Sequence, residues 1–194
     1  MASHGIRDQV AIVGMGCTRF IENWGQSLDD MMIDAANEAY ASAGVTKDDV
    51  DAYWFGTAQS AMSGIGLARA LQLQDKPVTR VENYCATGSE ALRQASYALA
   101  SGAYDLAMVV GAEKAKDTGF QGLNANPIPN DGTVRSLTAA AMFSMIVPAY
   151  SKKYDVPEET IREVLSHIAV KNHYNGARNE RAQFRKEITR ETVE

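Results

Sequence analysis

The sequence predicts an α/β fold in which a mostly parallel sheet carries helices on both faces. Short apolar runs rich in β-branched residues alternate with amphipathic stretches of helical period, and glycines lie between many of these segments. Strands that alternate with helices need crossover connections, which cover both faces of a parallel sheet. The 194 residues, 45% of them hydrophobic, suffice for one domain, or for one domain with a sizeable extension.

Four strands and three helices are expected in the first part of the chain. The first helix is the best delimited, because Ser27 and Asp30 form a capping pair and Gly44 supplies a stop. The expected strands are residues 9–14 (QVAIVG), 51–56 (DAYWFG), 78–84 (VTRVENY) and 105–111 (DLAMVVG). The expected helices are residues 27–44, 64–74 and a stretch from near Gly88 to Ser101 and Gly102.

The pattern changes after Glu113, so we expect a thiol-bearing α/β core at residues 1–114 and a loop and helical extension at 115–194. Residues 116–136 form a long polar stretch rich in Gly, Pro and Asn. A helix is expected over 136–154, with Pro148 kinking or dividing it. Another is expected from Pro157 to Asn175 and Gly176, with an inward face of Ile161, Val164, Leu165, Ile168 and Ala169.

Composition and charge exclude several classes of protein. The net charge of -5 argues against a nucleic-acid partner, although residues 171–190 hold six Lys or Arg against two Glu. A solvated surface is the default interpretation of that basic cluster, and contact with phosphates is the alternative. Neither a membrane-spanning apolar run nor a signal peptide is evident. We therefore expect a cytoplasmic protein, no membrane partner, and reduced thiols at Cys17 and Cys85.

The sequence does not support a metal-binding site or a nucleotide-binding site. The glycine cluster GMGCTR (14–19) has Arg19 in place of the third glycine of a dinucleotide fingerprint. His167 and His173 are six residues apart and do not share a helical face, and the sequence has no Cys-x-x-Cys. We expect no metal site and no resident cofactor.

Cys85 is the strongest candidate for catalysis, because it lies where a strand turns into a helix. The free N–H groups of a helix N-terminus favour a thiolate and could also hold the oxyanion of a tetrahedral intermediate. The small residues Thr87, Gly88 and Ser89 follow and let a substrate approach the backbone. The alternative is a buried cysteine that acts as a small hydrophobic residue.

The segments around Cys85 resemble a known family. NYCATGSEAL (83–92) and ALASGAYDLAMVVGAEK (98–114) resemble the nucleophile segment of the thiolase superfamily, and the Cys-Ala-Thr-Gly-Ser form is most similar to the sterol-carrier-protein-x type. VAIVGMGCTRF (10–20) resembles the first strand and turn of that family, and KNHYNGARNERAQF (171–184) its Lys-Asn-His stretch.

The resemblance implies an acyltransferase in which Cys85 takes an acyl group from acyl-CoA as a thioester. The acyl group then passes to CoA in thiolytic cleavage, or to an acetyl-CoA carbanion in Claisen condensation, so that CoA thioesters are substrates. Met142 falls where the family places a methionine against the acyl and pantetheine chain, and a core methionine is the alternative. The basic cluster, including Arg178 and Arg181, could meet the CoA phosphates. Glu113 matches the Gly-Ala-Glu of the family, where a structural turn role is expected.

The resemblance covers the N-terminal half of the family fold. In these enzymes a second half supplies a Gly-His-Pro histidine and a Cys-x-Gly cysteine, and neither motif occurs in this sequence. The chain is then the N-terminal part of a longer protein, one subunit of a split enzyme, or a noncatalytic relative. The resemblance also implies a homodimer through residues 78–84 and a possible companion subunit. A scaffold or CoA-binding subunit and another carbon-carbon lyase of the superfamily remain alternatives.

Overall fold

The computed structural model describes residues 5–115, 117 and 139–193, and these fall into two compact units. The first unit contains the residues up to 18 and those from 22 to 118, and the second contains residues 19–21 and those from 119 onward. The polar stretch expected at 116–136 lies almost entirely outside the described residues.

The first unit is built on a parallel sheet with the order β2-β1-β3. Its central strand pairs with both neighbours, and Tyr53 lies opposite Val78 on one side and Met108 on the other. All five residues of that strand are buried, as a strand covered on both faces requires. The strands are β1 Ala52–Gly56, β2 Val78–Val81 and β3 Ala107–Gly111, so three of the four expected strands and the α/β fold class are confirmed. The strand expected at 78–84 ends earlier, at Val81, because Tyr84 already belongs to a 3-10 turn.

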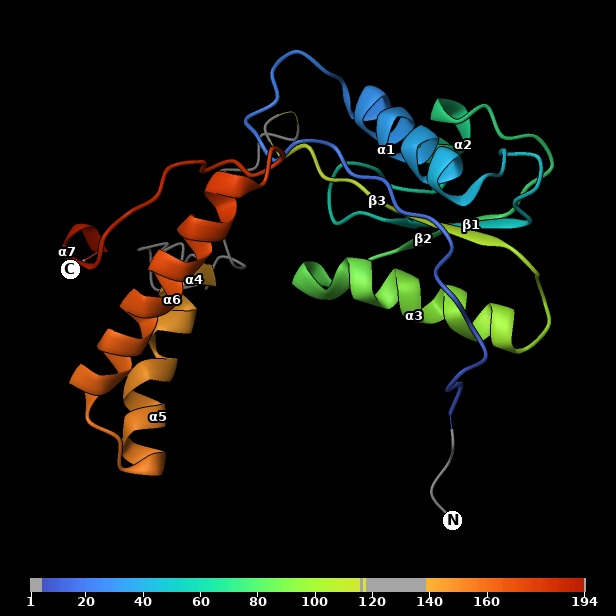
Figure 1. Ribbon diagram of the computed structural model, residues 1–194. Helices are drawn as coiled ribbons and strands as arrows, with labels where there is room; N and C mark the ends of the chain where they lie inside the picture. Colours follow the sequence, from blue (N-terminus) through green and yellow to red (C-terminus); the bar gives the residue numbers. More distant parts are fainter. Residues whose placement is uncertain (1–4, 116, 118–138, 194) are drawn as a thin grey trace, which may run out of the picture. The chain divides into compact units, whose positions relative to one another are not determined.

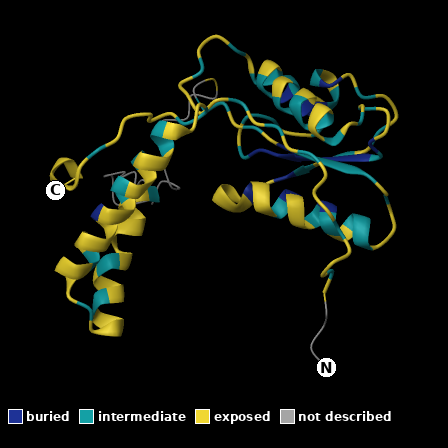
Figure 2. Ribbon diagram, viewed as in Figure 1, coloured by how far each residue is buried: buried dark blue, intermediate teal, exposed yellow. Residues whose placement is uncertain are grey.

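Helices cover both faces of this sheet (Figure 1). Successive residues of β1 point to opposite faces: Tyr53 and Phe55 pack with the helices α1 and α2, whereas Ala52 and Trp54 pack with α3. The two apolar clusters therefore sandwich the sheet, and the buried residues gather there (Figure 2). The helices are α1 Leu28–Ala43, α2 Ile65–Ala70 and α3 Thr87–Ala100.

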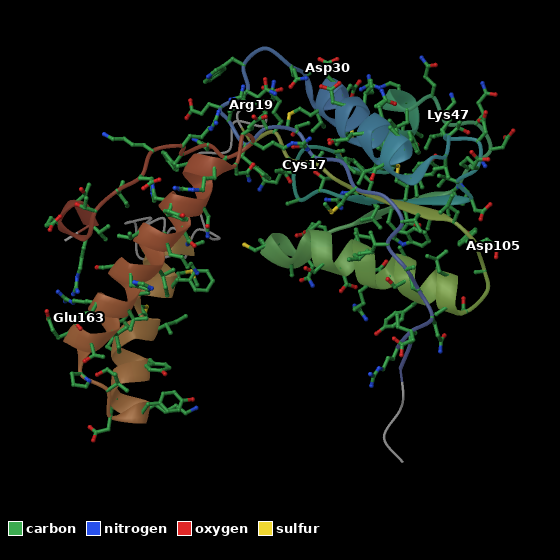
Figure 3. All side chains as sticks on the ribbon, viewed as in Figure 1. Cys17, Arg19, Asp30, Lys47, Asp105 and Glu163 are labelled. Atoms are coloured by element: carbon green, nitrogen blue, oxygen red, sulfur yellow. The ribbon has the colours of Figure 1, made fainter. Side chains whose placement is uncertain are left out.

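The boundaries of α1 follow the expected signals. Ser27 and Asp30 form a reciprocal capping box at its start, where Figure 3 labels Asp30. Gly44 ends the helix with a φ of 71°, a left-handed conformation that glycine adopts without strain. Local capping chemistry therefore defines this helix at both ends.

Residues 9–14, expected as a strand, do not form one and pair with none of β1, β2 or β3. The chain instead runs against α1, where a Cβ on Gly16 would lie 2.0 Å from the carbonyl oxygen of Ala35. The Cys17 N–H donates to the carboxylate of Glu38 at 2.9 Å (Figure 3). A β-branched run forms a strand only against a partner edge, and the backbone just after this run, at Met15 and Cys17, donates to side chains of α1 instead.

The second unit is helical, with α4 Ala139–Ser144, α5 Ile146–Tyr154, α6 Glu158–Arg178 and α7 Arg190–Val193. The break between α4 and α5 falls at Met145, which places Pro148 in the first turn of α5, where a missing N–H costs no helical hydrogen bond. The expected division of this helix is confirmed. No helix within the described residues is long and apolar enough to cross a bilayer.

Two expectations for α6 are wrong. Val164, Leu165 and Ile168, expected to face inward, are 39–52% exposed, because the nine-residue α5 offers a 21-residue helix little surface to pack on. The helix also continues through Gly176 to Arg178. This glycine serves a close approach, since a Cβ there would lie 2.7 Å from the carbonyl oxygen of Phe184.

Candidate active site

The carboxyl ends of the three strands meet at one edge of the sheet and deliver the candidate residues. Thr57 follows β1, Glu113 follows β3, and β2 continues through Asn83 into a 3-10 turn, η1 Tyr84–Ala86. The turn leads directly into α3. In open parallel sheets this edge is where ligands bind.

Cys85 lies in the middle of η1, two residues before α3 begins. It is a free thiol and is exposed in this chain. The preceding residue, Tyr84, has a φ of 46°, in the left-handed region that residues with a Cβ seldom occupy. The thiol is thus presented on a strained turn between a strand and a helix.

Hydrogen bonds from one buried hydroxyl close this turn. The Thr87 hydroxyl accepts the N–H of Asn83 at 2.8 Å and donates to the carbonyl of Tyr84 at 2.7 Å. The Tyr84 N–H in turn donates to the carboxylate of Glu82 at 2.6 Å. Sequence reasoning named Thr87 only as a small residue, because its two bonds depend on the folded path of the turn.

Gly88 lies in the first turn of α3, beside Cys85 in the sequence and in the fold. A methyl group added at Gly88 would meet no other heavy atom within 4 Å. Open space above this turn leaves the backbone accessible to a ligand, as the small-residue pattern predicts. The structure therefore brings together two of the five predicted site residues.

Glu113 organises the loop that follows β1. Its carboxylate accepts hydrogen bonds from the backbone N–H groups of Ala58 at 2.7 Å and Gln59 at 3.3 Å, and from the hydroxyl groups of Ser60 and Thr57. Burial would raise the pKa of this carboxyl group, but these hydrogen bonds together outweigh burial, so its pKa lies below the ordinary value of 4.5. The arrangement matches the structural turn role expected for Glu113.

Arg80 holds the opposite side of the same loop and was missed by sequence reasoning. Its Nη2 donates to the carbonyl oxygens of Thr57 and Ala58, both at 2.9 Å, while its Nε is buried without a hydrogen-bond partner within the described residues. A cation at the carbonyl side and the Glu113 carboxylate at the N–H side complement the peptide dipoles of the loop. The sequence signal that could have indicated this role was an arginine within a short strand.

The other three predicted site residues belong to the second unit. Met142 lies on α4 and is 49% exposed. The Arg178 guanidinium lies 3.4 Å over the ring of Tyr174 and donates to Glu187 at 2.7 Å. The Arg181 carbonyl accepts the N–H of Phe20 at 2.8 Å. Contact of these residues with CoA stays a prediction, and no cluster of potential metal ligands occurs within the described ranges.

The family description "Thiolase, N-terminal domain" matches residues 10–193. The chain belongs to the thiolase family. It is 33% identical to an acetyl-CoA acetyltransferase of Methanothermobacter thermautotrophicus, over 95% of this chain and 49% of that protein. It is 34% identical to an acetyl-CoA acetyltransferase of Methanocaldococcus jannaschii, over 95% of this chain and 48% of that protein. It is 29% identical to sterol carrier protein 2 of Bos taurus, over 97% of this chain and 37% of that protein. The chain thus spans about half the length of its two archaeal relatives.

Solved structures show the same thiolase fold. The Ltp2-ChsH2(DUF35) aldolase matches 94% of this chain and 47% of its own, with a TM-score of 0.72 and 25% identity. An acetyl-CoA acetyltransferase from Syntrophomonas wolfei matches 86% of this chain and 46% of its own, with a TM-score of 0.58 and 21% identity, which bears on the fold alone. The thiolase resemblance of the Cys85 segment and the fold class are confirmed.

Proposed function

We propose that the chain is the N-terminal half of an acyl-CoA acyltransferase of the thiolase type, with Cys85 as its nucleophile. One observation carries the proposal. In a chain of the thiolase family, a free and exposed thiol lies at the carboxyl end of β2, on the turn that enters α3. The relatives named acetyl-CoA acetyltransferase support this activity.

The proposed first step is acyl transfer to Cys85. The thiol gives its proton to a base, its sulfur bonds to the acyl carbon of an acyl-CoA, and the bond from that carbon to the CoA sulfur breaks. CoA leaves as the thiol after recovering a proton. By the family resemblance the base is a histidine of the second half. In the second step, CoA or an acetyl-CoA carbanion takes the acyl group from Cys85.

The first turn of α3 supports this chemistry. The N-terminus of this 14-residue helix carries partial positive charge, although the N–H groups of Ala86 and Thr87 already donate to the Asn83 and Tyr84 carbonyls. Partial positive charge of this kind stabilises negative charge on sulfur or on the oxygen of a tetrahedral intermediate. The open space at Gly88 leaves room for the thioester beside the start of the helix. In the same proposal, Met142 contacts the acyl and pantetheine chain, and Arg178 and Arg181 contact the CoA phosphates.

Two kinds of partner belong to this proposal. The first is a second copy of the chain, paired through the β2 edge, since β2 is bonded to β1 on one side and ends the described sheet on the other. The second is a companion subunit. The name of the structural neighbour, the Ltp2-ChsH2(DUF35) aldolase, joins two components, which supports this partner.

A second candidate activity is carbon-carbon lysis. The same neighbour, an aldolase by its name, matches 94% of this chain with a TM-score of 0.72. A lyase of this kind would use the same edge of the sheet without forming an acyl-cysteine. Acylation of Cys85 therefore separates the two candidates.

Intact-mass spectrometry of the purified native protein, with the second half that supplies the base, after exposure to acetyl-CoA and acid quenching tests the proposal. We expect one added acetyl group, mapped to the peptide that contains Cys85. Cys17, which is also exposed and outside any disulfide, is an internal control for nonspecific acetylation. Cys85→Ser should remove the adduct, and Cys17→Ser should keep it. An unmodified Cys85, with CoA bound, would overturn the acyltransferase assignment and favour the lyase or a binding subunit.

A further inference from the structure

The turn that carries Cys85 is held in a conformation that it would not adopt alone. Tyr84 has a left-handed φ of 46°, and Asn83 before it has a φ of -158° and a ψ of 50°. A bulky aromatic residue in the left-handed region is strained, and such strain persists only where surrounding contacts impose it. Tyr84 is 67% exposed, so packing of its ring supplies little of that restraint.

The hydroxyl group of Thr87 provides the restraint. It bonds to both ends of the strained segment, accepting the N–H of Asn83 at 2.8 Å and donating to the carbonyl of Tyr84 at 2.7 Å. Thr87 is only 8% exposed, so these bonds are largely shielded from competing water. The two contacts lock the backbone on the N-terminal side of Cys85.

The methyl group of the same side chain fixes where the hydroxyl lies. Thr87 Cγ2 packs against Gly56 at the end of β1, so closely that a Cβ on Gly56 would lie 3.1 Å from it. A threonine rotated about its Cα–Cβ bond would lose either this contact or the two hydrogen bonds. The sheet, the start of α3 and the turn are thereby joined through one side chain.

We propose that Thr87 is a positioning residue for Cys85. Its hydroxyl holds the Asn83–Tyr84 backbone so that the thiol stays exposed beside the start of α3. This inference rests on Cys85 being the nucleophile of the proposed function. Thr87→Val keeps the shape and the methyl contact, but it leaves the Asn83 N–H without the hydroxyl acceptor and the Tyr84 carbonyl with only the Thr87 backbone N–H. Thr87→Ser keeps the hydroxyl and loses the methyl anchor.

The test compares three forms of the native protein, each with its second half: wild type, Thr87→Val and Thr87→Ser, by two readouts. The first is alkylation of each thiol by iodoacetamide at pH 7, followed by peptide mass spectrometry. The second is the rate of acetylation of Cys85 at saturating acetyl-CoA. We expect Thr87→Val to slow acetylation of Cys85 on the order of tenfold to a hundredfold, because small displacements of a reacting group in a bound complex cost that much. Alkylation of Cys85 should also slow, because the thiol loses its exposed place beside the start of α3. Thr87→Ser should restore most of the rate, and alkylation of Cys17 should be the same in all three.

Thr87→Val with wild-type reactivity at Cys85, or Thr87→Ser no faster than Thr87→Val, would overturn the proposal. A parallel change in the alkylation of Cys17 would show that the effect is not confined to the Cys85 turn and would also overturn it. If Thr87→Val does not fold, Gly56→Ala replaces it, because the added methyl displaces the threonine while its hydroxyl remains. Unchanged Cys85 alkylation in that variant contradicts the proposal. Absence of acetylation in the wild-type chain sinks the acyltransferase function alone, since alkylation still measures positioning.

Discussion

The Glu113 carboxylate accepts the backbone N–H of Ala58 at 2.7 Å, which binds the segment after β3 to the loop after β1. The bond connects residues 55 apart in the sequence. Ser60 extends the connection, because its hydroxyl donates to the same carboxylate and accepts the N–H of Lys114 at 2.7 Å. The carboxyl edge of the sheet is therefore stabilised around one carboxyl group.

Replacing Glu113 by Gln should make stability less dependent on pH. The folded state lowers the pKa of this carboxyl below 4.5, so its stabilising effect is fully present above pH 4.5 and is lost as the pH falls through the folded-state value. Glu113→Gln should therefore lower the melting temperature at pH 7. The difference from the wild-type chain should shrink below pH 4.5. Thermal denaturation followed by circular dichroism between pH 3 and pH 7 measures this.

A suitable control is Glu187→Gln, since Glu187 pairs with Arg178 at a half-exposed site in the second unit. Exposed ion pairs contribute about 0–1 kcal/mol, so this variant should change little at any pH. A Glu113→Gln difference that stays constant across the pH range would contradict the assigned role of the ionised carboxylate.

Adding a methyl group at Gly88 should separate binding from folding. Nothing lies within 4 Å of the added carbon, and alanine favours a helix over glycine by up to about 1 kcal/mol, so Gly88→Ala should be at least as stable as the wild-type chain. Acetylation of Cys85 should nevertheless fall, by about tenfold, because the methyl group takes space that a substrate needs. Melting temperature and acetylation rate measured on one preparation test both halves. A stable variant with unchanged acetylation would remove Gly88 from the site.

The same substitution at Gly176 should have the opposite effect on stability. The methyl group would meet the carbonyl oxygen of Phe184 at 2.7 Å, and a backbone atom cannot turn aside as a flexible side chain can. Overpacking of this kind costs about 1–3 kcal/mol, which exceeds the gain of about 1 kcal/mol in helix propensity. The segment after α6 should detach, with loss of the 2.9 Å contact between His173 and the Lys186 carbonyl.

Limited proteolysis measures this detachment, and Gly88→Ala serves as the matched control. Cleavage within residues 179–189 should be faster in Gly176→Ala than in the control. The ion pair of Arg190 with Glu163, labelled on α6 in Figure 3, is too exposed to hold the segment by itself. Equal protection in both variants would show that the close approach at Gly176 is dispensable.

Removing the Tyr53 hydroxyl should destabilise the first unit by about 1–2 kcal/mol. The side chain is fully buried, and its hydroxyl bonds to the hydroxyl of Tyr40 at 3.0 Å and to the carbonyl of Lys47 at 3.2 Å. Tyr53→Phe leaves both partners short of a hydrogen bond. Urea denaturation gives the change in free energy, and Tyr97→Phe, at a half-exposed ring, should change it far less. Similar values for the two variants would contradict the stabilising role of the buried pair.

The sequence by itself determined the elements whose signals are local. The alternating apolar runs located β1, β2 and β3, and the Ser27 cap and Gly44 stop defined α1, because capping and periodicity act within a few residues. The place of Cys85 between a strand and a helix was predictable for the same reason. The thiolase resemblance rested on that same short segment.

Only the tertiary structure decided the features that depend on distant partners. Residues 9–14 have the composition of a strand, yet their backbone runs against α1, since pairing needs an edge that a local pattern cannot specify. Gly176 was expected to end a helix, but it lies within α6 and lets the Phe184 backbone approach closely. The two hydrogen bonds of the Thr87 hydroxyl and the hydrogen bonds of the Glu113 carboxylate could not be predicted from the sequence either. Hydrogen bonds and close contacts of this kind form between residues that are distant in the sequence and close in the fold. A short window of neighbouring residues therefore does not predict them.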